Sequence, residues 1–265
     1  MEDRSLAPEP KPHDKIAGDY ALLPPDAAHW ALFLDLDGTL IDIADAPDGV
    51  SVPADLPPLL DRLSHLLGGA LALVSGRPIS DIDRLFSPYR FAAAGLHGLQ
   101  LRLPGGQTAS DEATDVDALR ARARDLVAAL PGTVLEDKGG TLALHYRGAP
   151  RHGEALRQGA LALIAKRPDL SLLSGKMVLE IKPRGIAKGK AVKKLASLAP
   201  FAGRTPIFVG DDVTDRDGFK AVRELGGRAV LVGDPKMAAA CLVLADPDAV
   251  RAWLARLAGR LEGTP

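Results

Sequence analysis

Short apolar runs recur along the chain, and several of them end in acidic or glycine-containing loops. Residues 31–34, 70–74 and 206–209 are apolar throughout, which is typical of strands buried on both faces of a parallel sheet. Residues 91–95 and 229–232 have the same character and predict two further strands. The pattern therefore predicts an open sheet made largely of parallel strands.

Between these strands the apolar residues follow a helical period. Leucines recur on one side of residues 56–67, and Gly68-Gly69 ends that helix. Residues 188–198 and 247–261 are also amphipathic and predict one helix before and one after the later strands. Strands that alternate with helices in this way indicate the α/β class.

The pattern changes between residues 99 and 183. Leu99, Leu101 and Leu103 alternate with polar residues, as in a half-exposed strand. Two hairpins follow, each preceded by a helix; the strands are residues 134–138, 141–147, 170–174 and 177–181, and the helices are residues 116–130 and 153–166. Hairpins combined with two helices predict an α+β insert whose helices cover one face of its sheet.

These changes of pattern predict the domain organisation. We expect a core domain made of residues 19–98 and 184–265, and an inserted cap domain of residues 99–183. Residues 1–18 are rich in proline and charge and predict a mobile tail. They lack the basic-then-apolar order of a signal peptide.

Alternation within the insert separates an apolar face from a charged face. The apolar face carries Leu142, Leu144, Leu179 and Ile181. The opposite face collects Glu136, Lys138, His145, Arg147, Glu180 and Lys182. Taken alone, these residues favour an ordinary solvated face with cross-strand pairs over a ligand surface.

Composition and charge narrow the possible partners. The 265 residues carry 33 basic and 34 acidic side chains, and 46% are hydrophobic, which is enough for a sizeable core. A net charge of −1 gives no electrostatic basis for binding nucleic acid or a membrane, and no apolar run is long enough to span a bilayer. The single cysteine, Cys241, excludes an intramolecular disulfide and fits a reducing compartment. We expect a cytoplasmic monomer that acts on a small molecule.

The loop after the first apolar run carries the strongest chemical signal. Asp35 and Asp37 follow that strand directly, and Gly38 and Thr39 come next. In open α/β sheets the reaction site lies outside the carboxyl ends of the strands. Two aspartates there are costly without a positive partner, and Mg²⁺ prefers such oxygen ligands. An Asp-Gly turn alone would explain Gly38 but not Asp35.

Other strand ends carry complementary groups. Ser75-Gly76-Arg77 follows the second strand, where a hydroxyl before a helix can bind phosphate oxygens or simply cap the helix. Lys188 begins a helix, a position the helix dipole disfavours for a cation unless an anion lies nearby; a solvated lysine is the alternative. Four aspartates follow the strand 206–209 and would repel one another without a cation: Asp211, Asp212, Asp215 and Asp217.

Together these groups supply the parts of phosphoryl transfer, which depends on positioning and on neutralising charge. We hypothesise that Asp35 attacks phosphorus and that Asp37 serves as general acid and base. Mg²⁺ would be held by Asp35, by the backbone carbonyl of Asp37 and by Asp211. Ser75 and Lys188 would bind the phosphoryl oxygens, and Gly76 and Arg77 would contact the substrate. Asp215 would orient Lys188 or a metal-bound water, while Thr39 and Asp212 support the site.

Six segments carry a resemblance to a known family. They are DLDGTLIDIA from Asp35, VSGRP from Val74, GLHG from Gly95, EDKGGTLALHYR from Glu136, LEIKPRGIAKGKAV from Leu179 and VGDDVTDRDGF from Val209. The chain resembles the haloacid dehalogenase-like superfamily, with the insert as the larger cap type. Within it, the cap segments and GDDVTD are similar to the bacterial trehalose-6-phosphate phosphatases.

The resemblance implies a Rossmann-like core with an inserted α+β cap and Mg²⁺-dependent hydrolysis of trehalose 6-phosphate through an aspartyl-phosphate. It also implies that Glu136, Lys138 and Glu180 bind the distal glucose, with His145 and Arg147 on the same face. The chain reads TDRD where many relatives read TDE, which puts the roles of Arg216 and Asp217 in question.

Other functions fit parts of the pattern. A phosphatase for sucrose phosphate or mannosyl-phosphoglycerate would use the same reaction centre. A phospho-acceptor signalling domain also combines aspartates, a hydroxyl, a lysine and Mg²⁺, but it has no use for Asp37 or for the insert. An inactive sugar-phosphate binding module would not need the full set of Asp35, Asp37, Ser75, Lys188 and Asp211.

Overall fold

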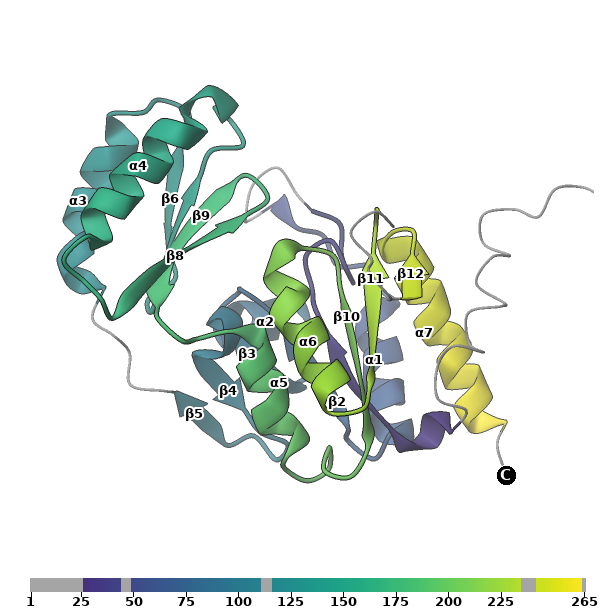
Figure 1. Cartoon of the computed structure of the whole chain (residues 1–265). Coiled ribbons are helices and arrows are strands. Elements are labelled where there is room, and N and C mark those ends of the chain that lie inside the picture. Colours follow the sequence, from purple (N-terminus) through teal and green to yellow (C-terminus); the bar gives the residue numbers. More distant parts are fainter. Residues whose placement is uncertain (1–25, 44–48, 111–115, 235–241, 264–265) are drawn as a thin grey trace, which may run out of the picture.

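The computed structural model describes residues 26–43, 49–110, 116–234 and 242–263. The predicted tail of residues 1–18 and Cys241 lie outside these ranges. The described part forms two lobes, each built on its own sheet (Figure 1). Among the described residues, no helix is both long and apolar enough to cross a membrane.

The larger lobe is built on an eight-stranded sheet with the order β12-β11-β10-β1-β2-β3-β4-β5. Its strands are β1 (Trp30–Leu34), β2 (Leu71–Val74), β3 (Ala92–Gly95), β4 (Gln100–Arg102), β5 (Thr108–Ser110), β10 (Thr205–Gly210), β11 (Arg228–Val232) and β12 (Leu242–Leu244). The neighbours from β12 to β3 are parallel. The predicted α/β class is therefore confirmed.

The register of the parallel strands aligns the loops that carry chemistry. At the end of β1, Leu34 is paired with Val209 on one side and with Leu73 on the other. The backbone N–H of Asp35 donates to the carbonyl of Val209 at 3.0 Å. The acidic loop after β1, the Ser75 loop after β2 and the aspartates after β10 consequently emerge at one edge of the sheet.

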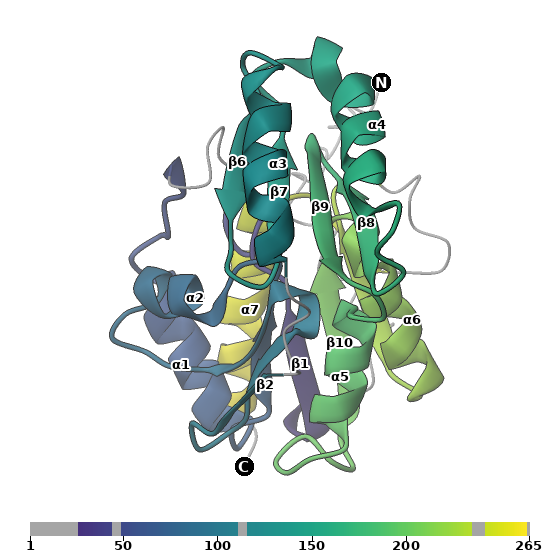
Figure 2. The same cartoon turned by 90° about the vertical axis from the view of Figure 1, so that its left-hand side faces the viewer.

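Helices cover both faces of this sheet (Figure 2). They are α1 (Leu56–Leu66), α2 (Ile79–Leu85), α5 (Lys188–Ala196), α6 (Arg216–Glu224) and α7 (Pro247–Glu262). Helix α1 packs on α7 and helix α5 packs on α6. Aromatic pairs fill the layers, such as Phe33 on Phe201 at 5.3 Å and Trp30 on Trp253 at 6.4 Å between ring centroids.

Residues 100–110 correct the predicted boundary between core and cap. Strand β4 pairs antiparallel with β3, and β5 pairs with β4, so both extend the core sheet instead of joining the cap. Leu99 and Leu101 are both buried, as expected for the apolar side of a half-exposed strand. Arg102 is also buried, and its guanidinium donates to Asp83 and to the carbonyl of Phe91. The start of the cap therefore moves from residue 99 to the segment before α3 (Asp117–Ala128).

The smaller lobe is the cap. Its antiparallel sheet has the order β6-β7-β9-β8, made of β6 (Val134–Asp137), β7 (Leu142–His145), β9 (Val178–Pro183) and β8 (Leu170–Gly175). Helices α3 and α4 (Gly153–Ile164) cover one face of it. The cap has a hydrophobic cluster of its own, separate from that of the core, and includes Leu142, Leu144, Leu179 and Ile181, as the alternation predicted.

Candidate active site

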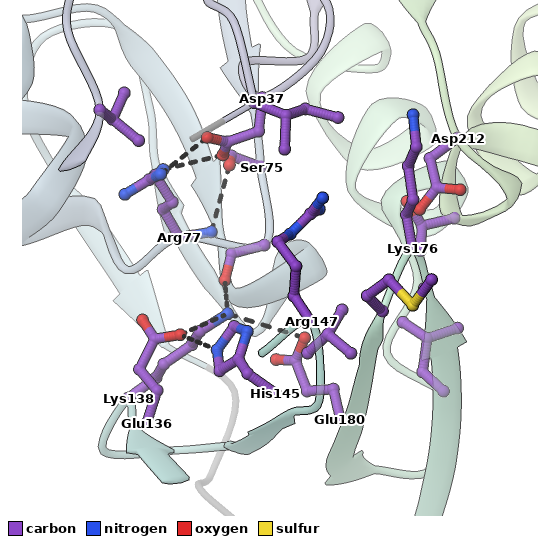
Figure 3. A pocket seen from close by; sticks show the side chains of 18 of the residues that line it. Asp37, Ser75, Arg77, Glu136, Lys138, His145, Arg147, Lys176, Glu180 and Asp212 are labelled. Atoms are coloured by element: carbon purple, nitrogen blue, oxygen red, sulfur yellow. Dashed lines mark hydrogen bonds and ion pairs between the residues drawn. The ribbon is translucent and has the colours of Figure 1, made fainter. Parts of the chain in front are cut away.

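A cavity of about 520 Å³ lies where the two lobes face one another (Figure 3). The core lines it with strand-end residues such as Asp35, Asp37 and Ser75, and the cap lines it with the exposed face of its sheet. The remaining predicted residues that line it are Gly76, Arg77, Glu136, Lys138, His145, Arg147, Glu180, Asp211 and Asp212. The fold thus brings together residues that lie in separate motifs of the sequence.

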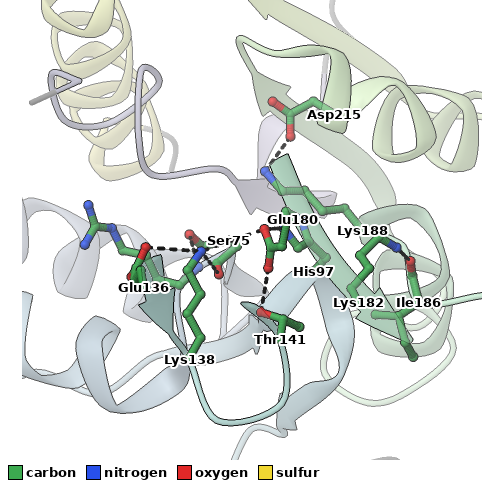
Figure 4. Close-up of polar contacts among 12 residues, drawn as sticks. Ser75, His97, Glu136, Lys138, Thr141, Glu180, Lys182, Ile186, Lys188 and Asp215 are labelled. Atoms are coloured by element: carbon green, nitrogen blue, oxygen red, sulfur yellow. Dashed lines mark hydrogen bonds and ion pairs between the residues drawn. The ribbon is translucent and has the colours of Figure 1, made fainter. Parts of the chain in front are cut away.

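The deepest part of the site is a buried network around Lys188. Its ammonium donates to Asp35 Oδ1 at 2.6 Å. It also donates to Asp215 Oδ1 at 2.7 Å (Figure 4). All three side chains are buried. Lys188 stands at the first residue of α5, so the helix dipole opposes its charge, and the two carboxylates stabilise it there.

The electrostatics of this network are dominated by negative charge. Burial, then the charge of Asp215, raises the pKa of the Asp35 carboxyl well above its ordinary value. The same two causes raise the pKa of Asp211 to about 7. Burial alone would lower the pKa of Lys188, but Asp215 and Asp35 more than offset it and the pKa rises. One ammonium therefore faces more carboxylates than it can neutralise.

Carboxylate oxygens of Asp35, Asp211 and Asp215 lie within 4.8 Å of one another and fit a hard divalent cation. The hydrogen bonds divide their roles. Asp215 Oδ1 accepts from Lys188, and Asp215 Oδ2 accepts the backbone N–H groups of Asp211 and Asp212, each at 3.0 Å. Asp215 therefore shapes the loop and holds the lysine, which leaves Asp35 and Asp211 as the preferred side-chain ligands.

The glycine of the acidic loop is required by geometry. Gly38 has φ +82°, a conformation that residues with a side chain rarely adopt. A Cβ at this position would collide with the carboxylate of Asp211, at 2.6 Å from Cγ. The neighbouring Thr39 is buried, and its Oγ1 donates to Asp211 Oδ1 at 3.3 Å. The loop after β1 thus holds Asp211 from two sides.

Asp37 lies nearer the mouth of the site and is paired with Arg77. Arg77 Nε donates to Asp37 Oδ2 at 2.8 Å and Nη2 donates to Oδ1 at 2.7 Å. Arg77 thus holds the carboxylate through both of its oxygens, which is compatible with the predicted use of the Asp37 backbone carbonyl to hold a metal ion. Ser75 is buried beside this pair, and its Oγ accepts the backbone N–H of Arg77 at 3.1 Å.

The charged face of the cap sheet forms the other wall of the cavity. His145 Nε2 lies 2.8 Å from Glu136 Oε2. Lys138 lies 3.9 Å from Glu136 and 3.8 Å from Glu180, and its ammonium donates to the carbonyl of Gly76 in the core at 3.2 Å. The predicted gathering of these residues on one face is correct.

Three residues that the sequence analysis singled out lie elsewhere. Lys182 does not line the cavity; it donates to the carbonyl of Ile186 in the segment that returns to the core (Figure 4). Arg216 and Asp217 are exposed at the start of α6 and do not line the cavity either. The TDRD departure therefore falls outside the cavity lining.

The structure also adds three residues that the sequence had not identified as site residues. His97 lines the cavity and contacts Glu180; in the sequence analysis it is included only as part of the GLHG segment. Thr141 donates to Glu180, and its alternation with Ala143 and His145 was the available signal. Lys176 lines the cavity from the turn between β8 and β9, a position without a local signal.

Comparisons with known proteins identify the relatives of this chain. A family model described as Trehalose-phosphatase matches residues 33–237. A probable trehalose-phosphate phosphatase of Sinorhizobium fredii is 45% identical over 236 residues, covering 88% of this chain and 89% of that protein. The trehalose-6-phosphate phosphatase of Escherichia coli is 42% identical over 238 residues, covering 89% of each.

A solved structure supports the fold. The C-terminal domain of trehalose-6-phosphate phosphatase from C. albicans matches with a TM-score of 0.79 at 22% identity, covering 94% of this chain and 97% of that chain. At this identity the match concerns the fold alone. From the family model and the two sequence relatives, the chain belongs to the trehalose-phosphatase family.

Proposed function

We propose that this protein hydrolyses trehalose 6-phosphate to trehalose and phosphate, with Mg²⁺ as the metal ion. One observation carries the proposal: a single cavity is lined at one end by the carboxylates around Lys188 and at the other by the charged face of the cap. The first end suits a phosphoryl group with a divalent cation, and the second offers hydrogen-bond partners for sugar hydroxyls. Membership of the family and the names of the two relatives support the same substrate.

Asp35 is the nucleophile in this proposal. Its Oδ1 accepts from Lys188, so Oδ2 is the oxygen that bonds to phosphorus while the bond from phosphorus to the sugar oxygen breaks. Lys188 and Ser75 bind phosphoryl oxygens, and the product of the step is an aspartyl-phosphate. Bound Mg²⁺ supplies the positive charge that keeps the carboxylates ionised and offsets the charge of the phosphoryl group.

Asp37 transfers the protons. It protonates the departing sugar oxygen and then takes a proton from the water that hydrolyses the aspartyl-phosphate. Both of its oxygens accept from Arg77, so loss of one of those hydrogen bonds would free that oxygen to turn toward the departing sugar oxygen. A phosphoryl group is a suitable competitor, since guanidinium groups bind phosphate and carboxylate with similar forked geometry. Arg77 therefore couples the arrival of substrate to the release of Asp37.

A substrate panel tests the function. Phosphate release is measured from trehalose 6-phosphate, sucrose 6-phosphate, mannosyl-phosphoglycerate and glucose 6-phosphate, each with Mg²⁺ and with EDTA. We expect kcat/KM to be highest for trehalose 6-phosphate and turnover to vanish in EDTA. Asp35→Asn serves as the control that removes the nucleophile, with an expected loss of at least about a thousandfold. Preference for another sugar phosphate would refute the substrate assignment but not the assignment of phosphatase activity.

Two smaller expectations stay with the proposal. A cytoplasmic location is supported by the single cysteine in the sequence. A monomeric state is tested by light scattering on the purified protein.

A further inference from the structure

Glu180 of the cap accepts hydrogen bonds from both lobes of the molecule. Thr141, also in the cap, donates through Oγ1 to Glu180 Oε1 at 2.6 Å. His97, in the core, places Nε2 2.8 Å from Glu180 Oε2 (Figure 4). His97 and Glu180 are only 6% and 5% exposed, so this contact between the lobes is shielded from water.

These partners fix the carboxylate without saturating it. An ionised carboxylate has about four acceptor positions, and His97 and Thr141 use two of them. Burial alone would raise the pKa of Glu180, but His97 and Lys138 outweigh it and hold that pKa below its ordinary range. Glu180 therefore presents an ionised, oriented acceptor to the cavity that it lines.

His97 is itself held by the loop that carries Ser75. Its backbone N–H donates to the carbonyl of Ser75 at 2.9 Å, and its φ of 58° lies in the left-handed region. A Cβ on Gly76 would come within 2.8 Å of the imidazole ring, so the ring packs closely against the backbone there. The ring is consequently placed by the same segment that lies against the phosphoryl site.

We propose that His97 is a positioning residue for sugar recognition, which orients Glu180 from the core lobe. The inference rests on the proposed function, because it takes the ligand of the cap face to be the sugar of a phosphorylated sugar. An acceptor that is already oriented costs the ligand less conformational entropy on binding. Since His97 and Glu180 belong to different lobes, the oriented acceptor also exists only when the cap lies over the core.

The test replaces His97 in two ways. Asn tolerates the left-handed backbone but is too short to reach Glu180, whereas Gln offers an amide nitrogen with the reach of Nε2. We expect His97→Asn to raise KM for trehalose 6-phosphate about tenfold, with kcat and the kcat/KM for p-nitrophenyl phosphate unchanged within about twofold. We expect His97→Gln to recover most of the loss. His29→Asn, at an exposed histidine of the core, should change neither substrate.

Thr141→Val gives a second route if the loop does not tolerate Asn. It removes the other donor to Glu180 without altering the loop, and we expect a rise in KM for the same substrate alone. An unchanged KM for trehalose 6-phosphate in a folded His97→Asn or Thr141→Val protein overturns the inference. Equal losses on both substrates overturn it as well, because they indicate a role in holding the Ser75 loop.

The outcome is separable from that of the proposed function. If the unaltered protein does not hydrolyse trehalose 6-phosphate, the function is wrong whatever the variants do. If the unaltered protein hydrolyses trehalose 6-phosphate and His97→Asn has the same KM for it, only the proposed role of His97 is wrong.

Discussion

Gly38 is a residue whose identity follows from two separate constraints. Its backbone has φ +82°, and the space where a side chain would begin is filled by the carboxylate of Asp211. The first constraint affects stability, whereas the second affects the position of a predicted metal ligand. Substitution can separate them, because Gly105 has a similar φ of +91° and open space around it.

We therefore predict that Gly38→Ala costs more than Gly105→Ala. The control should lose about 1 kcal/mol of unfolding free energy from backbone strain alone. Gly38→Ala should lose more and should also raise the Mg²⁺ concentration for half-maximal rate about tenfold or further, because Asp211 must move. Urea unfolding and Mg²⁺ titrations of the rate measure the two effects. Equal Mg²⁺ requirements in both variants would contradict the steric explanation.

Asp211 gives a pH dependence whose sign can be stated. Its pKa is about 7 in the folded, metal-free protein against an ordinary 3.8, so the folded state binds this proton more tightly than the unfolded state. The stabilisation is complete below about pH 4 and is lost as the pH rises through about 7. Mg²⁺ requires the ionised carboxylate and should restore stability on the alkaline side.

We predict that in EDTA the midpoint temperature of thermal unfolding decreases as the pH is raised from 5 to 8. We also predict that Mg²⁺ raises this temperature more at pH 8 than at pH 5. Differential scanning fluorimetry across this range provides the measurement. Asp211→Asn should flatten the slope but not abolish it, since the pKa of Asp35 is raised as well. A slope unchanged in Asp211→Asn would assign the effect to another group.

At the scale of elements, alternating residues of the cap strands point to opposite faces of the sheet, one apolar face that packs on the helices and one charged face that lines the cavity. Leu144 and Leu179 pair across β7 and β9 on the apolar face, while Glu136, Ala143 and Glu180 form one row across three strands on the other face. A substitution on the charged face should therefore change what the cavity binds without changing how the cap packs.

We predict that Glu136→Gln raises KM for trehalose 6-phosphate about tenfold and leaves p-nitrophenyl phosphate turnover unchanged, because the smaller substrate does not reach the cap face. Initial rates on both substrates measure the difference. Glu154→Gln, an exposed change on α4, is the matched control. A loss on both substrates would place Glu136 in the chemistry instead of in sugar recognition.

Strand β4 shows where sequence patterns stop being informative. The alternation of Leu99, Leu101 and Leu103 predicts a strand, and the structure has one over Gln100–Arg102, but the alternation does not say which sheet that strand joins. That choice depends on the partner: Leu101 pairs opposite Ala94 of β3, and Arg102 finds Asp83 from α2. The pattern around β4 does not identify either partner, so the predicted cap began too early.

The candidate site likewise has residues that the sequence predicts and contacts that it does not. Asp35, Ser75 and Asp211 were predictable because each follows an apolar strand, and parallel strands end at one edge of a sheet. The contacts of His97 and Lys138 to the opposite lobe were not predictable, because they depend on how the cap lies over the core. Periodicity assigns a residue to a face, but it does not assign that face to a partner.

At the scale of the whole molecule, the buried apolar side chains of the described residues form two separate clusters. Leu144 is fully buried in the cap cluster, whereas Leu161 on α4 is 36% exposed. Since each lobe has its own core, damage to one should not unfold the other at once.

We predict that Leu144→Ala destabilises the cap by about 2–5 kcal/mol and that Leu161→Ala costs less than about 1 kcal/mol. Hydrogen exchange read by mass spectrometry should show lost protection in β7 and β9, with protection in β1 and β10 retained. Loss of protection in both lobes together would mean that the molecule unfolds as one unit.

The segment from β9 into α5 carries both ends of the reaction site on one short piece of chain. Glu180 lines the cavity from the cap and Lys188 contacts Asp35, with only the return to the core between them. An insertion or deletion in this connection would preserve every functional side chain and still change the span between them. Changes in the length of the connection between β9 and α5 can therefore alter the size of ligand that fits, while the side chains at both ends stay the same.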